Sequence, residues 1–341
     1  MEKGYLGLDI GSVSTKGAIL NDNAEVVASV YLETAGYPID ALKSVLDTLG
    51  RKAKKEGLDI CGVCTTGSGR RLAGAIVSAD VIKNEITCQS IGSLHYYPGA
   101  HSIIEIGGQD SKCIQIDESG VPIWYNMNSL CSAGTGSFLS HTAARLDIPI
   151  TEFGDRALRS RMNISIAGKC GVFAESDLIH KQQLGFNKDD LIKGLCTALV
   201  RNFMNNVSKN RHLKSQIVFC GGVANNIGVV KALEDELKSP IIVHKYNEIS
   251  GCIGAALVAM EEVSQESHFV GFGTAERQFT SRGFQCCGCS NNCEIAVILR
   301  EDEVIAAFGS RCGKWERLTK YKSPKGSFES TEANSWIKIC T

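Results

Sequence analysis

The sequence has 341 residues, 43% of them hydrophobic, and a formal net charge of −1 that arises from 36 basic and 37 acidic side chains. This length accommodates two domains with packed cores, and the balanced charge gives no indication of a nucleic-acid or anionic-membrane partner. The N-terminus MEKGYLGLDIG enters a strand pattern without signal-peptide features, and no apolar run reaches the roughly 20 residues of a membrane span, so we expect a cytoplasmic protein without a membrane partner.

The first half of the chain begins with strand patterns around a turn of small residues. Residues 5–10 are predicted to form a strand, residues 11–14 a turn, and residues 15–20 and 25–34 two further strands. A helical pattern covers residues 39–56, and a short apolar strand at 60–66 ends in a Gly-Ser-Gly turn.

The same pattern recurs further along the chain. The segment Leu8-Asp-Ile-Gly-Ser-Val-Ser-Thr-Lys16 aligns with Ile104-Glu-Ile-Gly-Gly-Gln-Asp-Ser-Lys112, and two more strand patterns follow the turn in both places. Chance likeness of two short glycine turns is the alternative, but the matching three-strand context favours an internal duplication.

The remaining patterns set the fold class and the domain limits. Helical patterns lie at 135–147, 172–184, 189–210, 226–237 and 250–263, and strand patterns at 216–222 and 241–244. Strands that alternate with helices predict an α/β protein. We expect a first lobe at 1–98, a second lobe at 99–264, a small cysteine-rich module at 265–322 with a hairpin at 294–299 and 304–308, and a loose tail at 323–341.

Three glycine turns are candidates for binding ATP or ADP. Small residues between two strands let the backbone approach a phosphate, so turns from both halves could clamp a triphosphate. Asp9 would orient Mg²⁺ through water, and Gln109 and Asp110 would position the attacking water as the other candidate catalytic residues. Lys16 and Lys112 would neutralise phosphate charge. The candidate nucleotide-binding residues are Gly11, Ser12, Ser14, Thr15, Lys16, Gly107, Gly108, Lys112, Gly134, Gly136, Gly221, Gly222 and Asn225.

Each turn has a simpler interpretation when it is taken alone. A plain hairpin also contains a glycine turn, and Asp9 could be a strand-end cap. The absence of a G-x-x-x-x-G-K-[ST] motif from the sequence disfavours a Walker-type ATPase. The order of the two phosphate turns and the adenosine turn at Gly221-Gly222 resembles the superfamily of actin, chaperone ATPases and sugar kinases. That resemblance implies duplicated ribonuclease-H-like lobes with the nucleotide in the cleft between them.

The 15 cysteines are unexpected in a chain without a secretion signal, where a disulfide framework is not anticipated. Core packing is the better explanation for four of them, Cys64, Cys113, Cys196 and Cys220. Cys131 and Cys170 differ because each lies just before a helix pattern, where the helix dipole lowers a thiol pKa. An iron–sulfur cubane needs four thiolates, so a cluster on a dimer axis and two unrelated thiols both remain open from spacing alone.

Five motifs carry a closer resemblance. They are Asp9-Ile-Gly-Ser with Lys16, Ile106-Gly-Gly-Gln-Asp110, Cys131-Ser-Ala-Gly-Thr-Gly136, Cys170-Gly-Val-Phe-Ala-Glu-Ser176 and Gly221-Gly-Val-Ala-Asn225. Together they resemble the 2-hydroxyacyl-CoA dehydratase activators and the ATPase subunits of benzoyl-CoA reductases, one ATPase family. The match spans about residues 4–262.

The resemblance implies an ATPase that drives electron transfer. It implies a homodimer with one [4Fe-4S] cluster between the subunits, held by Cys131 and Cys170 of each. Ferredoxin or flavodoxin would supply the electron, and an iron–sulfur dehydratase or reductase would accept it. One alternative is a small-molecule, sugar-type kinase of the same superfamily, which needs a carboxylate base and no cluster. Another is a non-catalytic nucleotide sensor or metal-binding scaffold, which measurable ATP turnover would exclude.

A second cysteine group lies in the C-terminal module. Cys286, Cys289, Cys293 and Cys312 flank the hairpin pattern, and unliganded clustered thiols oxidise readily. A structural Zn²⁺ or a second iron–sulfur cluster fits such a set of thiolates. Short activators that resemble residues 4–262 lack this stretch, which leaves the acceptor enzyme open.

Overall fold

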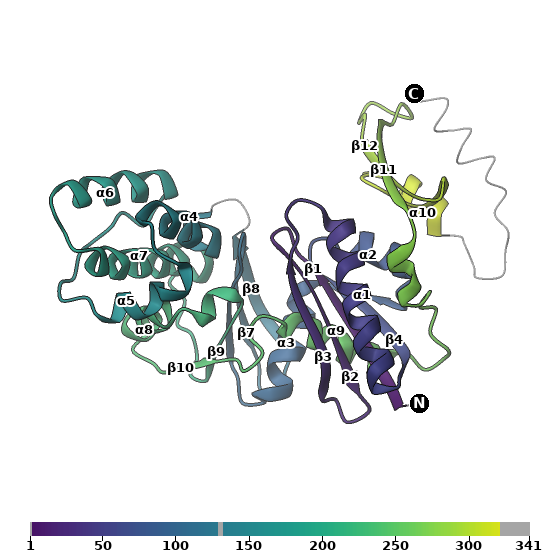
Figure 1. Cartoon of the computed structure of the whole chain (residues 1–341), viewed down its shortest axis with the longest axis horizontal. Coiled ribbons are helices and arrows are strands. Elements are labelled where there is room, and N and C mark those ends of the chain that lie inside the picture. The colour runs from purple at the N-terminus through teal and green to yellow at the C-terminus, as the bar shows by residue number, and fades with distance from the viewer. Residues whose placement is uncertain (1, 129–131, 321–341) are drawn as a thin grey trace.

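The computed structural model describes residues 2–128 and 132–320 and contains two large sheets with helices around them (Figure 1). The first sheet has five strands in the order β3-β2-β1-β4-β5. β1, β2 and β3 are antiparallel, and β4 and β5 continue the sheet in parallel with β1. The strands are β1 (Glu2–Ile10), β2 (Ser14–Asn21), β3 (Val26–Glu33), β4 (Leu58–Thr66) and β5 (Val81–Ile82).

The second sheet repeats this topology with the order β10-β9-β6-β7-β8. β6, β7 and β8 are antiparallel, and β9 and β10 extend the sheet in parallel with β6. The internal duplication and the α/β class are therefore confirmed. The strands are β6 (Ser102–Ile106), β7 (Ser111–Ile116), β8 (Pro122–Asn128), β9 (Ile217–Cys220) and β10 (Ile241–Val243).

Helices cover both faces of the first sheet, and alternate side chains of β1 point to opposite faces. Leu6 and Leu8 pack with α1 in one cluster, whereas Tyr5 packs with α9 in another. Gly7 lies against α9 so closely that a Cβ atom there would be 1.9 Å from the Cys252 carbonyl oxygen. The helices of the first lobe are α1 (Pro38–Glu56), α2 (Arg70–Val77) and α3 (Glu85–Tyr96), and α9 (Ser250–Glu262) joins them.

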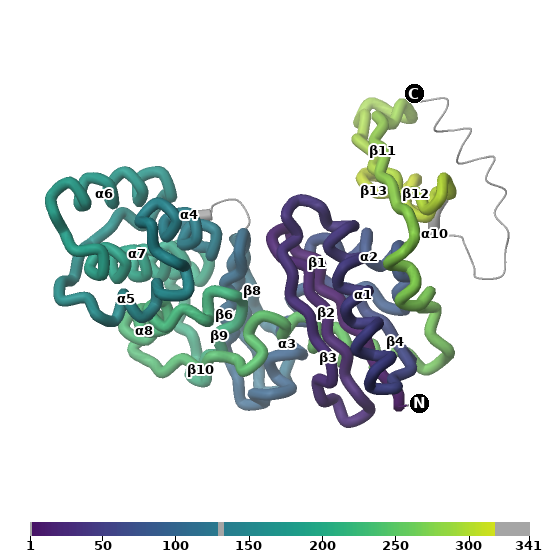
Figure 2. The backbone as a smooth tube through the Cα atoms, in the orientation of Figure 1, coloured from purple at the N-terminus to yellow at the C-terminus, as the bar shows by residue number. Residues whose placement is uncertain are grey.

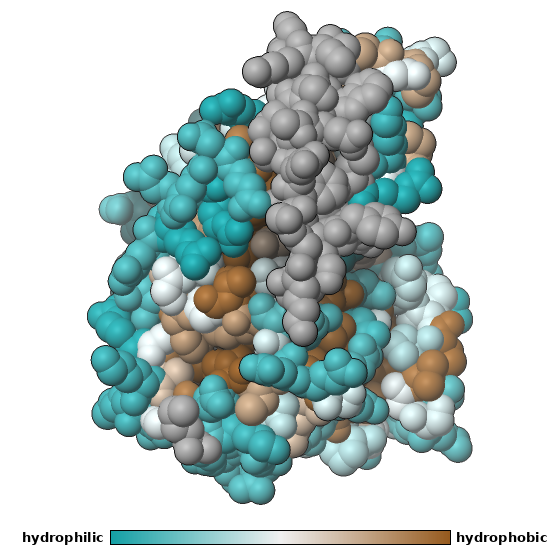
Figure 3. Space-filling model, turned by 90° about the vertical axis from the view of Figure 1, so that its right-hand side faces the viewer, coloured by the Kyte–Doolittle hydropathy of each residue, from teal (hydrophilic) through white to brown (hydrophobic). Residues whose placement is uncertain are grey.

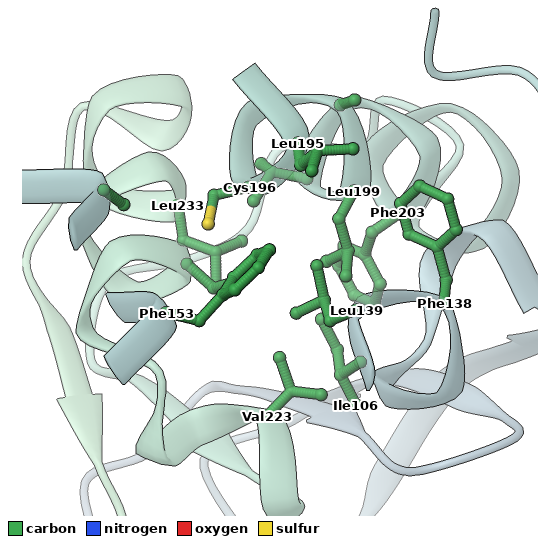
Figure 4. Packing of buried hydrophobic residues seen from close by; sticks show 14 of the residues in the cluster. Ile106, Phe138, Leu139, Phe153, Leu195, Cys196, Leu199, Phe203, Val223 and Leu233 are labelled. Atoms are coloured by element: carbon green, nitrogen blue, oxygen red, sulfur yellow. The ribbon is translucent and has the colours of Figure 1, made fainter. Parts of the chain in front are cut away.

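The second sheet has its main core on the side of the later helices (Figure 4). Phe153, Leu195, Leu199 and Phe203 point toward one another in this core, and Ile106 enters it from the sheet. The helices are α4 (Gly136–Leu146), α5 (Phe153–Leu158), α6 (Gly171–Gln183), α7 (Lys188–Phe203) and α8 (Ile227–Leu237). The four cysteines expected in the core are buried, as predicted: Cys64, Cys113, Cys196 and Cys220.

Helices α3 and α9 pack against each other between the two sheets (Figure 1). Glycines bring their backbones together, since a Cβ atom at Gly254 would lie 1.8 Å from the Cys88 carbonyl oxygen and one at Gly92 would lie 2.0 Å from that of Ser250. α9 contacts β1, β2 and β4, so the chain returns to the first lobe after the second sheet. This differs from the expectation of one contiguous lobe at 99–264.

The C-terminal module stands on the side of the first lobe away from the second (Figure 2). It contains a three-stranded antiparallel sheet, β11 (Phe279–Gln285), β12 (Glu294–Arg300) and β13 (Glu303–Phe308), and α10 (Lys314–Lys320). The expected hairpin is β12–β13. Asp80 accepts hydrogen bonds from the Ser267 hydroxyl and the His268 amide, both at 2.7 Å, which ties the module to the first lobe.

The surface seen from the side of this module mixes hydrophilic and hydrophobic residues (Figure 3). Within residues 2–128 and 132–320, no helix has the length and apolar character that crossing a membrane requires.

The sequence patterns did not predict four helices and two strands, namely α2, α3, α5, α10, β5 and β11. The buried side of α3 shows why, because it consists largely of small and polar residues such as Gln89, Ser90 and Ser93. A helix that packs through such residues has no apolar period to detect. The helix expected at 189–210 ends at Phe203 and continues as a π-helical turn, Met204–Ser208.

His244 makes the fold sensitive to acid. Its Nδ1 accepts a hydrogen bond from the Tyr246 amide at 2.9 Å, and its Nε2 lies 3.4 Å from the Gly92 carbonyl oxygen, so the ring is neutral with the proton on Nε2. Burial lowers the pKa of His244 from 6.5 to about 4. Between these values the unfolded chain binds more protons than the folded one, so the free energy of unfolding falls as the pH falls.

We therefore expect wild type to lose about 3 kcal/mol more stability between pH 6.5 and pH 4 than the His244→Gln variant. Urea unfolding at several pH values measures this difference. The exposed His141 is the matched control, and His141→Gln should keep the wild-type slope. Equal slopes in wild type and His244→Gln would contradict the assignment.

Candidate nucleotide-binding site

A cleft lies between the two lobes. All three predicted glycine turns reach it, although they come from distant parts of the sequence. The predicted residues that line it are Asp9, Gly11, Ser12, Ser14, Lys16, Gly107, Gly108, Gln109, Asp110, Lys112, Gly221 and Gly222.

The two phosphate turns have the same backbone closure. The Gly11 amide donates to the Ser14 carbonyl oxygen at 2.9 Å, and the Gly107 amide donates to the Asp110 carbonyl oxygen at 3.0 Å. The turns also approach each other, because a Cβ atom at Gly108 would lie 2.7 Å from Val13 Cγ1. Only glycine fits at that position, so the duplicated turns form one site.

Each turn carries a lysine paired with a carboxylate across the neighbouring strands. Asp9 is opposite Lys16 in the β1–β2 register, and their side chains are 3.1 Å apart. Glu105 is opposite Lys112 in the β6–β7 register, at 2.6 Å. Lys112 also lies 3.0 Å from Asp110 and 3.5 Å from Glu85.

These pairs fix the charge state of both lysines. Burial by itself lowers the pKa of Lys16, but the Asp9 carboxylate and other neighbouring groups, Glu105 among them, together outweigh that effect, and the net pKa is raised. For Lys112, burial is again opposed by Glu105, Asp110 and Glu85, and the pKa is raised. Both ammonium groups are charged at neutral pH and can attract phosphate oxygens.

The acidic residues of the cleft could supply one or two ligands to a metal ion whose other ligands come from the nucleotide and water. Among residues 2–128 and 132–320, no group of three His, Cys, Asp or Glu side chains is arranged to hold a metal ion. Mg²⁺ at nucleotide sites typically takes one or two carboxylates and fills its other positions with phosphates and water. Asp9 lines the cleft and can be such a carboxylate.

Several cleft residues were not predicted. Glu105 had a detectable signal, because the repeat aligns it with Asp9. Glu85 and Gln89 come from α3, and Gln89 donates to the Ser250 hydroxyl at 2.7 Å across a large sequence separation. No local motif indicates such residues. The missed lining residues are Val13, Tyr31, Thr66, Ser68, Glu85, Gln89, Glu105, Asn247, Glu248, Ser250 and Gly251.

Four predicted nucleotide-binding residues do not line the cleft. Thr15 is buried, and its hydroxyl pairs with that of Thr34 at 2.9 Å. Asn225 is exposed and donates to Glu248, which does line the cleft, at 2.8 Å. The Gly136 amide donates to the Gly107 carbonyl oxygen at 2.8 Å, so it supports a phosphate turn, and Gly134 faces α7.

Of the two candidate cluster ligands, Cys170 is described and Cys131 lies outside the described residues. Cys170 directly precedes α6 in extended conformation, and its side chain makes no capping hydrogen bond. The thiol is partly exposed and has glycine next to it in Gly171. This placement fits a thiolate ligand at a helix N-terminus.

Within the described residues, the four C-terminal cysteines differ in their exposure and are not gathered into one set of ligands. Cys286 and Cys293 are partly buried against the module core, while Cys289 and Cys312 are exposed. The Trp315 indole N–H donates to Cys286 Sγ at 3.3 Å, and this hydrogen bond lowers the pKa of the Cys286 thiol. In the described conformation these thiols do not form a metal-binding group, and the second metal site stays a prediction.

Two duplicated α/β lobes, with paired glycine turns and charged lysines in the cleft between them, define an ATPase of the actin-like fold. The chain belongs to the BadF/BadG/BcrA/BcrD ATPase family, whose sequence model matches residues 6–259. The C-terminal module lies outside this match.

Known proteins of this type are similar over nearly their whole length. The structure of the activator of the 2-hydroxyisocaproyl-CoA dehydratase from Clostridium difficile with bound ADPNP has a TM-score of 0.70 and 34% identity, covering 76% of this chain and 95% of that one. Component A of the Acidaminococcus fermentans (R)-2-hydroxyglutaryl-CoA dehydratase has a TM-score of 0.69 and 32% identity, covering 77% and 99%. The activator of lactoyl-CoA dehydratase from Anaerotignum propionicum is 34% identical over 264 residues, 76% of this chain and 99% of the relative.

Proposed function

We propose that this chain is an activator that uses ATP hydrolysis to drive low-potential one-electron transfer to a partner enzyme. The electron would come from ferredoxin or flavodoxin and leave from a [4Fe-4S] cluster shared across a homodimer. The acceptor would be an iron–sulfur dehydratase or reductase such as a 2-hydroxyacyl-CoA dehydratase. The similarity to dehydratase activators at 34% identity supports this class of partner.

One observation carries the proposal. The amides of Gly136 and Ser137, at the start of α4, donate to the carbonyl oxygens of Gly107 and Gly108 at 2.8 Å each. The turn assigned to the phosphates is therefore bonded to the segment that follows Cys131. A nucleotide that moves this turn also moves that segment.

The cleft residues supply the ATPase half of the function. Lys16 and Lys112 would bind phosphate oxygens, and Asp9 would orient Mg²⁺ through water. Gln109 and Asp110 would hold the attacking water in line with the terminal phosphate. These roles rest on the position of each side chain in the cleft.

The surface beside Cys170 supports a subunit interface. Val172 and Phe173, the second and third residues after it, are 69% and 68% exposed. Large apolar side chains that stand together at a surface typically mark a contact with another molecule. Cys131 and Cys170 of two copies would then provide the four thiolates of a cubane, which supplies reversible one-electron chemistry when bound.

Magnitudes indicate why ATP would be needed. A helix N-terminus contributes about 0.3–1 kcal/mol to a nearby anion, which corresponds to roughly 10–40 mV for one electron. The dipole at Cys170 therefore tunes a potential only modestly. A larger decrease requires a change in the surroundings of the thiolates, and closure of the lobes on a nucleotide can produce one.

The test is the content of iron and acid-labile sulfide after anaerobic purification. Wild type should contain about two irons per chain, one cubane per dimer, and the Cys131→Ser/Cys170→Ser double variant should lose them. Cys61→Ser, which replaces a partly exposed thiol far from α6, is the control and should retain iron.

Other outcomes separate the alternatives. About six irons per chain, with four retained in the double variant, would assign a second cluster to the C-terminal cysteines. Iron-free wild type would contradict the electron-transfer function. ATP-dependent phosphorylation of a sugar by that iron-free protein would establish the kinase alternative.

A further inference from the structure

Asn202 occupies an unusual position near the end of α7. Its side chain is 1% exposed and lies between the loop that leads to Cys170 and the short 3-10 helix Ser132–Gly134. It is therefore in contact with the segments that flank both proposed cluster ligands, although it is distant from each in sequence.

On one side the Asn202 amide group fixes the loop before Cys170. Its Nδ2 donates to the Gly168 carbonyl oxygen at 2.7 Å and lies 3.4 Å from that of Lys169. The same loop is held along α7 by Arg201, which donates to the Ile166 carbonyl oxygen at 2.6 Å. The backbone that sets the position of Cys170 is thus bonded directly to α7.

On the other side Asn202 meets the segment that follows Cys131. A Cβ atom at Gly134 would lie 2.7 Å from Asn202 Oδ1, so a larger residue at position 134 would displace this oxygen. Two residues later, Gly136 bonds to Gly107 of the phosphate turn. A continuous series of contacts therefore links the phosphate turn to Gly168. It consists of the Gly136–Gly107 hydrogen bond, the contact of Gly134 with Asn202, and the hydrogen bond from Asn202 to Gly168.

The chemistry of Asn202 is not explained by packing. Its buried Oδ1 has no hydrogen-bond partner among the described residues. An unpaired buried carbonyl oxygen is costly, and this cost offsets part of the stability that the Nδ2 hydrogen bonds contribute. Asn202 therefore holds the loop before Cys170 through Nδ2 while its Oδ1 faces Gly134 without a hydrogen bond among the described residues, an arrangement that suits a positioning role.

We infer that Asn202 is the positioning residue that transmits movement of the Gly107-Gly108 turn to Cys170. The inference deepens the proposed function and rests on it for the cluster, but the linkage between nucleotide and thiol exists in the chain without the cluster. When the turn shifts on nucleotide binding, Gly134 presses on Asn202, and the Asn202 amide moves the loop of Cys170.

The first test uses the full chain without iron. The alkylation rate of Cys170 by iodoacetamide is measured by peptide mass spectrometry, with and without a non-hydrolysable ATP analogue. In wild type the nucleotide should change this rate about fivefold or more, as expected for coupled sites. In Asn202→Leu the rate should no longer respond, while the affinity for the analogue stays at the wild-type level.

Matched controls are available in the same chain. Asn205 is an exposed asparagine one turn further along, and Asn205→Leu should keep the wild-type response. The exposed Cys312, in the C-terminal module, serves as an internal control whose alkylation should not depend on the nucleotide. If Asn202→Leu fails to fold, Asn202→Ala provides the same comparison without the larger side chain.

A second test uses the anaerobically purified protein. Wild type should show a nucleotide-dependent shift of the midpoint potential; Asn202→Leu should retain iron but lose this shift. A Cys170 response that persists in both Asn202 variants, or is absent from wild type, would overturn the inference. Wild type that shows the Cys170 response but holds no iron would overturn the proposed function and leave the Asn202 linkage in place.

Discussion

The Asp9→Asn variant should hydrolyse ATP on the order of 10²–10³ times more slowly than wild type. Asp9 ends β1, lines the cleft and pairs with Lys16 at 3.1 Å. Asparagine keeps the size of the side chain but removes the negative charge that would orient Mg²⁺ at the terminal phosphate. Steady-state hydrolysis with saturating Mg²⁺ and ATP measures the effect.

The control for this prediction is an exposed carboxylate. Asp47 on α1 pairs only with Arg51 at the surface, and Asp47→Asn should hydrolyse ATP at the wild-type rate. Thermal unfolding of Asp9→Asn has to accompany the assay, because the substitution also leaves the Lys16 ammonium without its partner. A folded Asp9→Asn protein with wild-type activity would remove Asp9 from the catalytic site.

The Gly254→Ala variant should be destabilised by about 3 kcal/mol or more and accumulate poorly as folded protein. A Cβ atom there would lie 1.8 Å from the Cys88 carbonyl oxygen, a backbone atom that cannot rotate away. α3 and α9 would have to separate, and these helices form the packing between the two sheets. The cleft would lose its geometry together with stability.

Gly273→Ala is the comparison for Gly254→Ala. A Cβ atom at Gly273 would have no neighbour within 4 Å, so its stability should stay close to wild type. Urea unfolding of both variants gives the difference. A Gly254→Ala protein as stable as Gly273→Ala would mean that α3 and α9 are further apart than described.

The C-terminal module lies outside the part of the chain that resembles the known activators. The family match ends at residue 259, and the dehydratase activators cover only about three quarters of this chain. The module is anchored to the first lobe through Asp80, whereas Cys170 belongs to the second lobe. The module is therefore attached to a different lobe from the one that carries Cys170.

The sequence by itself determined the features that depend on neighbouring residues. The turn at Gly11 is closed by Ser14 and the turn at Gly107 by Asp110, so their glycines, lysines and acids were recognisable as a repeated unit. Strands β1–β3 and β6–β8 follow these turns directly, and pairing of consecutive strands is local. The position of Cys170 directly before a helix was predicted for the same reason, since α6 begins at the next residue.

Only the tertiary structure decided the features that depend on contacts between distant segments. Gln89 and Ser250 enter the cleft because α3 meets α9, and Asn202 lies between Gly134 and Gly168 because its helix, α7, contacts both segments. The return of α9 to the first sheet depends on Gly7 and Gly254, whose missing side chains let backbones touch. Such contacts follow from close packing in three dimensions, which residue spacing along the chain does not encode.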